Sequence, residues 1–585
     1  MPSKLSQFWQ ELKRRRVVHV ITVYASAAFV IIELISNLAE PLNLPANLQL
    51  VAVIILATGF PLAIILSWIF DMTSKGVLRT KPLDKDSEIK EQKVPNAWKV
   101  ATIISFMIIT GLVLLNIIGL NNRAIAGSVK SLVILPFGNY TGDDDMEYFV
   151  SGMHSSLIGD MGQLSSLRVL GETSANAYKD ADKALTQIAR ELNVDAALET
   201  TVMCLDDSIC LQVKLVSGFH EEKQLWVGNF KEQKGEILNL YNRITRQIAD
   251  EVKIKLKPRD REMLVEVRHR PAALLESVYK GKFYMSLLTR EGFELGLKFY
   301  NDAIEIDPSD PLPYLGLALG YNNAGHVSGL AVEADRLAVE YALKALSLDS
   351  SLSEAHVVIA SKALYREWDF TKGEQYLRLA LEMNQNNAEA HYHYGWFWML
   401  SDQLEKAVSE LEIAVEIDPV NLLYIANLAG LYMWKGHWDK AIEYANMALE
   451  LNSVYPLSLY VLGASYAGKG MFREAIEAHE KGVAINPSFK HGLGTVYALS
   501  GEKERALTIA EELELIQAPW YSWGIAEIYA ALGEMDKAIY WIEEAYEKRQ
   551  DFVPWFKNYI FYEPLKKDAR FNEIVNSLDY PQGKF

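Results

Sequence analysis

Residues 414–452 read AVEIDPVNLLYIANLAGLYMWKGHWDKAIEYANMALELN, so the chain returns to nearly the same phrase after 34 residues. Small residues recur at matching places through the C-terminal half of the chain. Their steps are 42, 35, 34, 34 and 34 residues, at Ala303, Ala345, Ala380, Ala414, Ala448 and Gly482. Regular spacing of small residues predicts helical units that pack closely and stack in series.

Each unit also places a large aromatic side chain beside its small residues. One unit, for example, carries Gly463, Tyr466 and Ala475. A period of 34 residues with two helices per unit is the signature of tetratricopeptide repeats. The sequence therefore predicts an all-α solenoid of about eight repeats over residues 271–550, followed by a capping helix and tail over residues 551–585.

Three apolar runs lie near the N-terminus, at residues 17–39, 48–70 and 100–120. Each is about the twenty residues that a helix needs to cross a bilayer. Hydropathy therefore predicts three transmembrane helices, which form a membrane anchor over residues 17–125.

The Lys and Arg residues predict the topology of this anchor. Residues 1–16 hold five of them, the loop between the first two runs holds none, and residues 71–99 hold seven. Positive segments remain in the cytoplasm. We therefore expect a cytoplasmic N-terminus over residues 1–16, a multi-pass inner-membrane protein, and a periplasmic part over residues 121–585.

The part after the predicted anchor is strongly acidic. The whole chain has a net charge of −17, and residues 1–125 hold 13 Lys and Arg against 8 Asp and Glu, which leaves −22 for residues 126–585. Nucleic-acid binding needs a basic surface for phosphate contacts. The sequence therefore predicts no nucleic-acid partner.

Residues 128–257 alternate strand-like and helix-like patterns. Runs such as SLVILPF, CLQVKLVS and QLWVGNFK favour strands, and the long run ILNLYNRITRQIADEV has helical spacing. We predict a small α+β domain that ends in a long amphipathic helix.

The same segment resembles the TolB amino-terminal-like domain that bacteria often fuse to tetratricopeptide repeats. The likeness rests on SLVILPFGNYTGDDDMEYFVSGMHSSLI, ARELNVDAALETTV and ITRQIADEVKIKL. It implies a bacterial protein and a domain that serves protein contacts and not catalysis. The chain departs from the family at Ser151 and Gly152 and at Glu172, Thr173 and Ser174.

The two cysteines, Cys204 and Cys210, flank a short polar turn between two strand-like runs. A two-residue turn at Asp206 and Asp207 would place Cys204 opposite Ile209. A shift of one residue in register would instead bring the two cysteines together, so a disulfide and two free thiols are both consistent with the sequence.

Three aromatic residues in the repeats fall outside the packing positions: Tyr392, Trp396 and Trp520. Tyr392 and Trp396 are four residues apart and so share one face of a helix. Stacked repeats create a concave groove for an extended peptide or a partner helix. These three side chains are the candidate partner contacts, and a glycan that stacks on them is the alternative ligand.

The sequence predicts no catalytic, cofactor-binding or metal-binding residues. His391 and His393 lie two residues apart, so a helix would point them in different directions. No further Cys or nearby His completes a ligand set around the two cysteines. The sequence thus favours a non-enzymatic, membrane-anchored scaffold that binds proteins, and the alternative is a sensory or accessory protein of nutrient uptake, for example of polysaccharides.

Overall fold

The chain divides into two compact units, residues 1–127 and residues 128–585. The computed structural model describes residues 129–205, 208–218, 224–251, 256–265, 269–324, 331–516 and 521–581. In the first unit it describes isolated residues between positions 17 and 67 and a two-stranded antiparallel sheet. That sheet pairs β1 (Phe70–Thr73) with β2 (Gly76–Arg79).

The structure contradicts the predicted three transmembrane helices and, with them, the predicted multi-pass place in the inner membrane. Within the described residues, no helix has both the length and the apolar character needed to span a bilayer. Residues 100–120 and most of residues 17–39 and 48–70 lie outside the described part of the chain. The prediction rested on the length and apolar content of three runs, which show that side chains favour burial but do not identify the medium that buries them.

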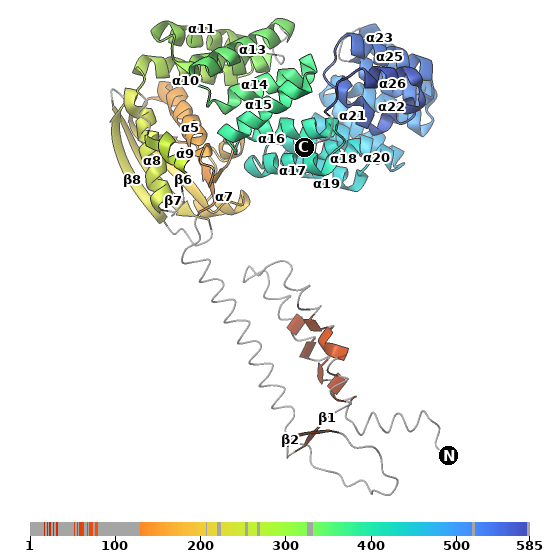
Figure 1. The fold of residues 1–585 in the computed structure, drawn as a ribbon, viewed down its shortest axis with the longest axis horizontal. Coiled ribbons are helices and arrows are strands. Elements are labelled where there is room, and N and C mark those ends of the chain that lie inside the picture. The colour runs from red at the N-terminus through yellow and green to blue at the C-terminus, as the bar shows by residue number, and fades with distance from the viewer. Residues whose placement is uncertain are drawn as a thin grey trace. The chain divides into compact units, whose positions relative to one another are not determined.

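A mixed six-stranded sheet begins the second unit (Figure 1). Five strands lie in the order β5-β3-β6-β7-β8, and β4 also pairs with β6. β3 runs parallel to β5 and β6, whereas β6, β7 and β8 form an antiparallel meander. The strands are β3 (Ser131–Ile134), β4 (Gly138–Asn139), β5 (Arg168–Val169), β6 (Ala196–Leu205), β7 (Ser208–Ser217) and β8 (Gln224–Gln233).

Helices cover both faces of this sheet. On one face, Leu132 and Ile134 pack with α5 (Glu147–Gly162) and α8 (Ile237–Glu251). On the other face, Val133 packs with α7 (Leu185–Glu191). Successive side chains of a strand point to opposite faces, which explains why all four residues of β3 are buried. Two short helices complete the domain, α6 (Glu172–Asn176) and α9 (Pro258–Val265).

Eight antiparallel helix pairs follow, and they form a tetratricopeptide-repeat solenoid that leads away from the sheet (Figure 1). The first helices of the pairs are α10 (Ala272–Ser286), α12 (Pro311–Asn323), α14 (Ser353–Lys362), α16 (Ala388–Leu400), α18 (Leu422–Trp434), α20 (Pro456–Gly468), α22 (Lys490–Ser500) and α24 (Ser522–Leu532). The second helices are α11 (Arg290–Ile306), α13 (Ala331–Leu348), α15 (Phe370–Met383), α17 (Leu404–Ile417), α19 (Trp438–Leu451), α21 (Phe472–Ile485), α23 (Lys503–Ile516) and α25 (Met535–Glu547).

The small residues that define the repeat lie where each second helix ends. All six are fully buried or nearly so, and the carbonyl of each accepts a hydrogen bond from the backbone N–H of an Asp or Asn four residues later. Those Asp and Asn residues are Asp307, Asp349, Asn384, Asp418, Asn452 and Asn486. In five of the six, all but Asp418, the side chain also accepts a hydrogen bond from the backbone two residues further on, which closes a turn and ends the helix.

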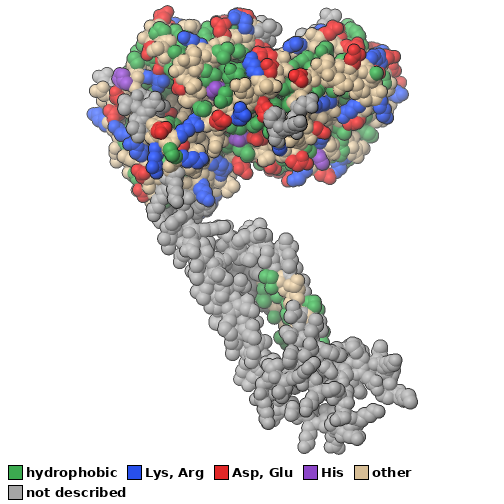
Figure 2. Space-filling view, in the orientation of Figure 1, with side chains coloured by type: hydrophobic (Ala, Val, Ile, Leu, Met, Phe, Trp, Pro, Cys, Tyr) green, Lys and Arg blue, Asp and Glu red, His purple; other side chains and the backbone are tan. Residues whose placement is uncertain are grey.

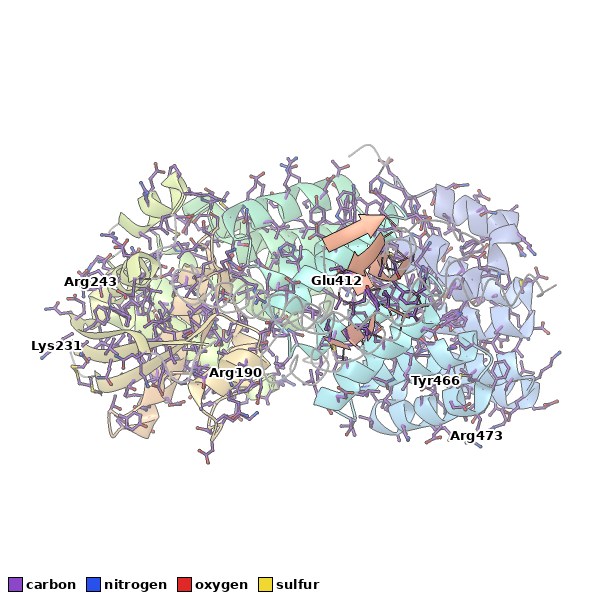
Figure 3. All side chains as sticks on the ribbon, turned by 90° about the horizontal axis from the view of Figure 1, so that it is seen from below. Arg190, Lys231, Arg243, Glu412, Tyr466 and Arg473 are labelled. Carbon is purple, nitrogen blue, oxygen red and sulfur yellow. A yellow bond between two sulfur atoms is a disulfide. The ribbon has the colours of Figure 1, made fainter. Side chains whose placement is uncertain are left out.

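The first helices line the inner side of the solenoid. Neighbouring first helices, such as α18 and α20 or α22 and α24, contact one another more extensively than neighbouring second helices do. The array therefore curves with its first helices inside, and we call this side the inner face. Exposed charged side chains such as Lys231 and Arg473 project outward from the edges of the unit (Figure 3).

The chain ends in three short 3-10 helices and one α-helix. They are η7 (Val553–Asn558), η8 (Ile560–Tyr562), η9 (Leu565–Lys567) and α26 (Ala569–Asn576). α26 packs on α25, the last helix of the repeats.

Overpacking a helix crossing should destabilise the solenoid. Ala441 in α19 is fully buried, so Ala441→Trp should lower the free energy of unfolding by about 1–3 kcal/mol or more. Met447→Trp in the same helix is the matched control, because Met447 is 39% exposed. Thermal melting of the full-length chain should show a lower Tm for the first variant, and equal melting curves would contradict the repeat register.

Candidate functional site

The chain's own C-terminal segment, residues 550–567, occupies the inner face over the later repeats. Trp555 Nε1 donates a hydrogen bond to the carbonyl of Trp396 at 2.7 Å, and the Asn558 amide donates to the carbonyl of Met399. Further along, the Tyr562 hydroxyl donates to the carbonyl of Trp523 at 2.6 Å. The segment thus bonds to the backbone of the first helices α16 and α24.

Aromatic rings of the segment fill the spaces between these helices. The ring of Tyr559 lies 4.4 Å from that of Trp434, and the ring of Trp555 lies 5.2 Å from that of Tyr365. Trp555 and Tyr559 are almost fully buried. This part of the inner face is therefore already covered and is not open to a partner.

Of the three predicted contact residues, Tyr392 and Trp396 lie in the described part of the chain, and their surroundings differ. Trp396 is only 3% exposed and packs against the rings of Trp434 and Trp555. It therefore belongs to the core, because the C-terminal segment fills the space that the repeat pattern leaves open. Trp520 lies outside the described residues. Tyr392 is half-buried and borders a pocket.

That pocket, of about 280 Å³, lies on the part of the inner face that the C-terminal segment leaves uncovered. We call it the inner-face pocket. Its walls come from α12, α14, α16 and α18, from the π-helix η4 (Ala363–Glu367), and from the start of the C-terminal segment. It is lined by Asn322, Asn323, Ser361, Lys362, Tyr365, Arg366, Glu389, Tyr392, His393, Leu423, Tyr424 and Asp551.

One side of the pocket is built from ion pairs. Lys362 Nζ lies 2.7 Å from one carboxylate oxygen of Asp335, and Arg366 Nε lies 2.9 Å from the other. Arg366 also pairs with Asp551 at the start of the C-terminal segment. Arg366 lies in the π-helical turn η4, which Lys362 immediately precedes, and such turns occur often at functional sites.

Another part of the pocket lining is aromatic. Tyr392 and Tyr424 pack with their ring centres 5.5 Å apart, and the Tyr365 hydroxyl forms a hydrogen bond of 3.2 Å with His393 Nδ1. Burial raises the pKa of all three tyrosine hydroxyls, and the nearby Glu389 carboxylate adds to the effect in each. Glu389 lines the same pocket as the three tyrosines.

A buried carboxyl lies beneath the C-terminal segment. Glu527 of α24 is 2% exposed, and its Oε2 has no hydrogen-bond partner. It faces the hydroxyls of Tyr460 and Tyr559, which are 3.0 Å apart. Burial raises the pKa of Glu527 to about 8 from an ordinary 4.5, so the side chain is protonated at neutral pH.

Replacing this carboxyl should make the chain more stable near neutral pH. Between about 4.5 and about 8, the folded state keeps the Glu527 proton that the unfolded chain has lost, so Glu527 lowers stability as the pH rises. Glu527→Gln removes this dependence and should raise the Tm by at least about 2 °C at pH 8. Near pH 4 the variant and the parent chain should melt alike, and a gain of the same size at both pH values would contradict this assignment.

The side chain of Asp418 holds the α+β domain to the solenoid. At the equivalent place of other repeats, the side chain closes a local turn instead. Asp418 Oδ1 accepts hydrogen bonds from the Ser174 backbone N–H at 2.8 Å and from the Ser174 hydroxyl at 2.5 Å. The Gly171 N–H also donates to the Ile417 carbonyl at 2.8 Å. Asp418 is thus the one among the six repeat-ending Asp and Asn residues named above that serves another domain.

A neighbouring repeat loop makes a second contact with the domain. The Asn386 amide donates to the carbonyls of Gly162 and Leu167 at 2.7 and 2.8 Å, and Asn386 Oδ1 accepts from the Val169 N–H. Arg168 also donates to the Glu416 carbonyl at 2.6 Å. The loops before α16 and α18 therefore hold the edge of the sheet at β5.

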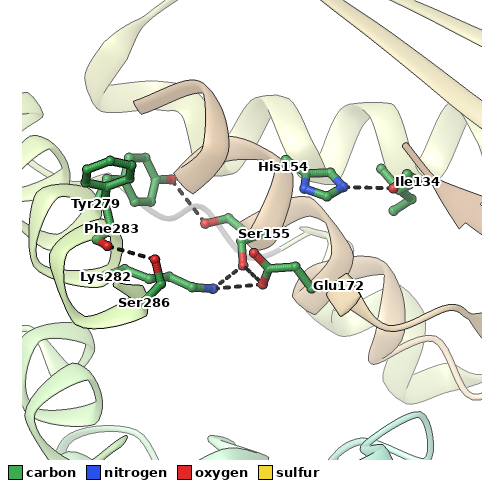
Figure 4. A network of polar contacts seen from close by, with 9 residues as sticks. Ile134, His154, Ser155, Glu172, Tyr279, Lys282, Phe283 and Ser286 are labelled. Carbon is green, nitrogen blue, oxygen red and sulfur yellow. Dashed lines mark hydrogen bonds and ion pairs between the residues drawn. The ribbon is translucent and has the colours of Figure 1, made fainter. Parts of the chain in front are cut away.

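A third contact joins the domain to the first repeat helix (Figure 4). Lys282 of α10 donates to the Ser155 hydroxyl and lies 3.2 Å from Glu172, and Ser155 donates to the same carboxylate. A side chain at Gly152 would clash with the ring of Tyr279. Gly152, Glu172 and Ser174, where the sequence departs from the resembled family, are therefore contact positions between domain and solenoid.

Breaking the Asp418 contact should cost more than breaking an ordinary repeat turn. Asp418→Ala leaves the Ser174 N–H and hydroxyl without their acceptor, so we expect a loss of about 1–3 kcal/mol. Asp349→Ala at the equivalent place of another repeat is the control, since it removes only a local turn. Thermal melting and proteolysis of the full-length chain should show the difference, and equal effects of the two substitutions would contradict a docking role.

The two cysteines are joined by a disulfide in the structure. The register of β6 on β7 shifts between Val202 and Cys204, so that Cys204 lies opposite Cys210 and Leu205 opposite Ile209. A register shift of this kind cannot be read from alternation of side chains alone. Within the part of the chain that the structure describes, no cluster of three or more His, Cys, Asp or Glu side chains could hold a metal ion.

Comparison with known proteins gives one curated relative and a set of solved structures. No protein-family model matches the chain, so the resemblance to TolB amino-terminal-like domains is not supported. "Putative adenylate cyclase 3" of Rhizobium meliloti (strain 1021) is 28% identical over 132 residues, which cover 23% of this chain. The chain spans only 22% of the length of that relative.

Several solved structures of repeat proteins are similar. PilF of Pseudomonas aeruginosa is 20% identical, covering 36% of this chain and 93% of its own, with a TM-score of 0.30. PilW, a type IV pilus biogenesis factor, is 18% identical, covering 34% of this chain and 91% of its own, with a TM-score of 0.30. YrrB, a TPR protein with a peptide-binding site, is 21% identical, covering 36% of this chain and 97% of its own, with a TM-score of 0.25. Matches at this level carry no argument about function. The assignment of residues 272–547 as a tetratricopeptide-repeat solenoid rests on the 34-residue spacing and the paired helices.

Proposed function

We propose that this protein is a non-enzymatic scaffold that binds an extended peptide segment of a partner protein on the uncovered part of its inner face. The inner-face pocket carries the proposal, because it is a hollow on the side of the solenoid that is known to serve recognition in repeat proteins. Tyr392, predicted from the sequence as a contact residue, borders this pocket.

The C-terminal segment supports this proposal by its manner of binding. It is an irregular stretch held by hydrogen bonds to backbone carbonyls of first helices and by aromatic side chains inserted between them. A partner peptide that continued this path across α12 to α18 would meet the same kind of surface. Asp551, at the start of the segment, already forms one wall of the pocket.

The α+β domain serves as a rigid support in this proposal. Its contacts with the loops before α16 and α18 and with α10 use the polar groups at the edge of the sheet. Protein binding is therefore assigned to the solenoid. Acidic and basic side chains are interspersed over the face shown in Figure 2, which agrees with a protein partner and not with nucleic acid.

The alternative functions are not part of this proposal. A sensory or accessory role in nutrient uptake, and a glycan ligand, stay predictions from the sequence, and no contact described above favours them. The name of the curated relative describes a cyclase, and we propose no such activity for this chain.

Blocking the inner-face pocket should weaken peptide binding. Peptides selected on the full-length chain from a displayed library of random twelve-residue sequences supply the probes. Asn323→Trp places a large side chain at the exposed Asn323 of the pocket wall, and Tyr392→Ala removes an aromatic contact. Each should weaken the binding of the selected peptides at least about tenfold, since few residues carry most interface energy.

The matched control is Met447→Trp on α19, a second helix away from the inner face. It should leave peptide affinity, measured by fluorescence polarisation, unchanged. Circular dichroism checks that all three variants fold. Unchanged binding by both pocket variants, or an equal loss in the control, would show that the peptides bind elsewhere.

A further inference from the structure

We propose that the inner-face pocket takes a cationic side chain, lysine or arginine, from the bound peptide. The proposal rests on the proposed function and specifies its ligand. It follows from two features of the pocket, an aromatic wall and a carboxylate that the protein's own cations do not neutralise.

The aromatic wall is continuous. The rings of Tyr392 and Tyr424 are 5.5 Å apart, the ring of His393 lies 4.8 Å from Tyr392, and Tyr365 lies 5.5 Å from His393. Aromatic faces attract cations through their quadrupole, and the attraction grows where water is excluded. A row of rings along a pocket therefore suits the stem and head of a lysine or arginine side chain.

Glu389 supplies the charge. It lies in the first turn of α16 and lines the pocket together with Tyr365, Tyr392 and Tyr424. The Glu389 carboxylate lies 3.8 Å from His393 Nε2. The carboxylate is 41% exposed, so a ligand can reach it.

The two cationic side chains that line the pocket are already engaged in ion pairs. Lys362 is only 14% exposed and is held by Asp335, and Arg366 bridges Asp335 and Asp551. The two cations thus face three carboxylates, counting Glu389, and the balance is negative. An anionic ligand would have to break these pairs, whereas a cation adds to an existing attraction.

The amides of Asn322 and Asn323 border the same pocket. An amide side chain both donates and accepts hydrogen bonds, so these groups suit the main chain of a peptide. The pocket therefore combines groups for the peptide backbone with groups for one positively charged side chain.

The test compares peptides that differ in one side chain. The probes are acetylated and amidated heptapeptides of alanine and glycine with lysine, norleucine or glutamate at the centre. Isothermal titration with the full-length chain should show that the lysine peptide binds about tenfold more tightly than the norleucine peptide. Glu389→Gln should remove this preference. Glu412→Gln, which changes an exposed carboxylate of α17 away from the pocket, should keep it.

The relative affinities of the three peptides decide which kind of ligand the pocket takes. Equal affinity for lysine and norleucine peptides overturns the cationic side chain but leaves peptide binding in place. Preference for the glutamate peptide overturns it in favour of an anionic ligand at Lys362 and Arg366. Failure of all three heptapeptides to bind overturns this inference, whereas the proposed function is decided separately by the selected twelve-residue peptides and the two pocket variants.

Discussion

No helix pair in this chain can bury its apolar surface alone, and the rest of the structure follows from that constraint. Each pair covers the next through crossings at buried small residues such as Ala414, Ala448 and Gly482. A stack of this kind leaves two open ends. At one end α10 packs against α5 of the α+β domain, and at the other α26 packs against α25.

The same demand for burial explains why the chain folds back on itself. First helices of the later repeats carry large aromatic side chains, among them Trp396, Trp434 and Tyr460, on the inner face. The C-terminal segment covers them with Trp555 and Tyr559, which are themselves almost fully buried. The uncovered part of the inner face lies over the earlier repeats, where the inner-face pocket is lined by polar as well as aromatic side chains.

The domain contacts show how one repeat position acquires a second role. Asp349, Asn384 and Asn452 close the turn that ends their own helix, whereas Asp418 at the equivalent place accepts from Ser174. An Asp at the same repeat position can thus close a local turn, as Asp349 does, or accept hydrogen bonds from another domain, as Asp418 does. The fixed α+β domain then holds the first five repeats in one arrangement, because its contacts reach from α10 to the loop before α18.

The sequence by itself determined the repeats and the strands, because both depend on local spacing: 34 residues between small side chains, and alternation along β6, β7 and β8. Tyr392 could be singled out from its place off the packing register. Trp396 stood off the register in the same way, yet it is core, because Trp555 contacts it from 159 residues further along the chain. The pocket, the pairing of Cys204 with Cys210 and the docking of Ser174 on Asp418 were decided only by the tertiary structure, since each depends on segments whose approach no local pattern records.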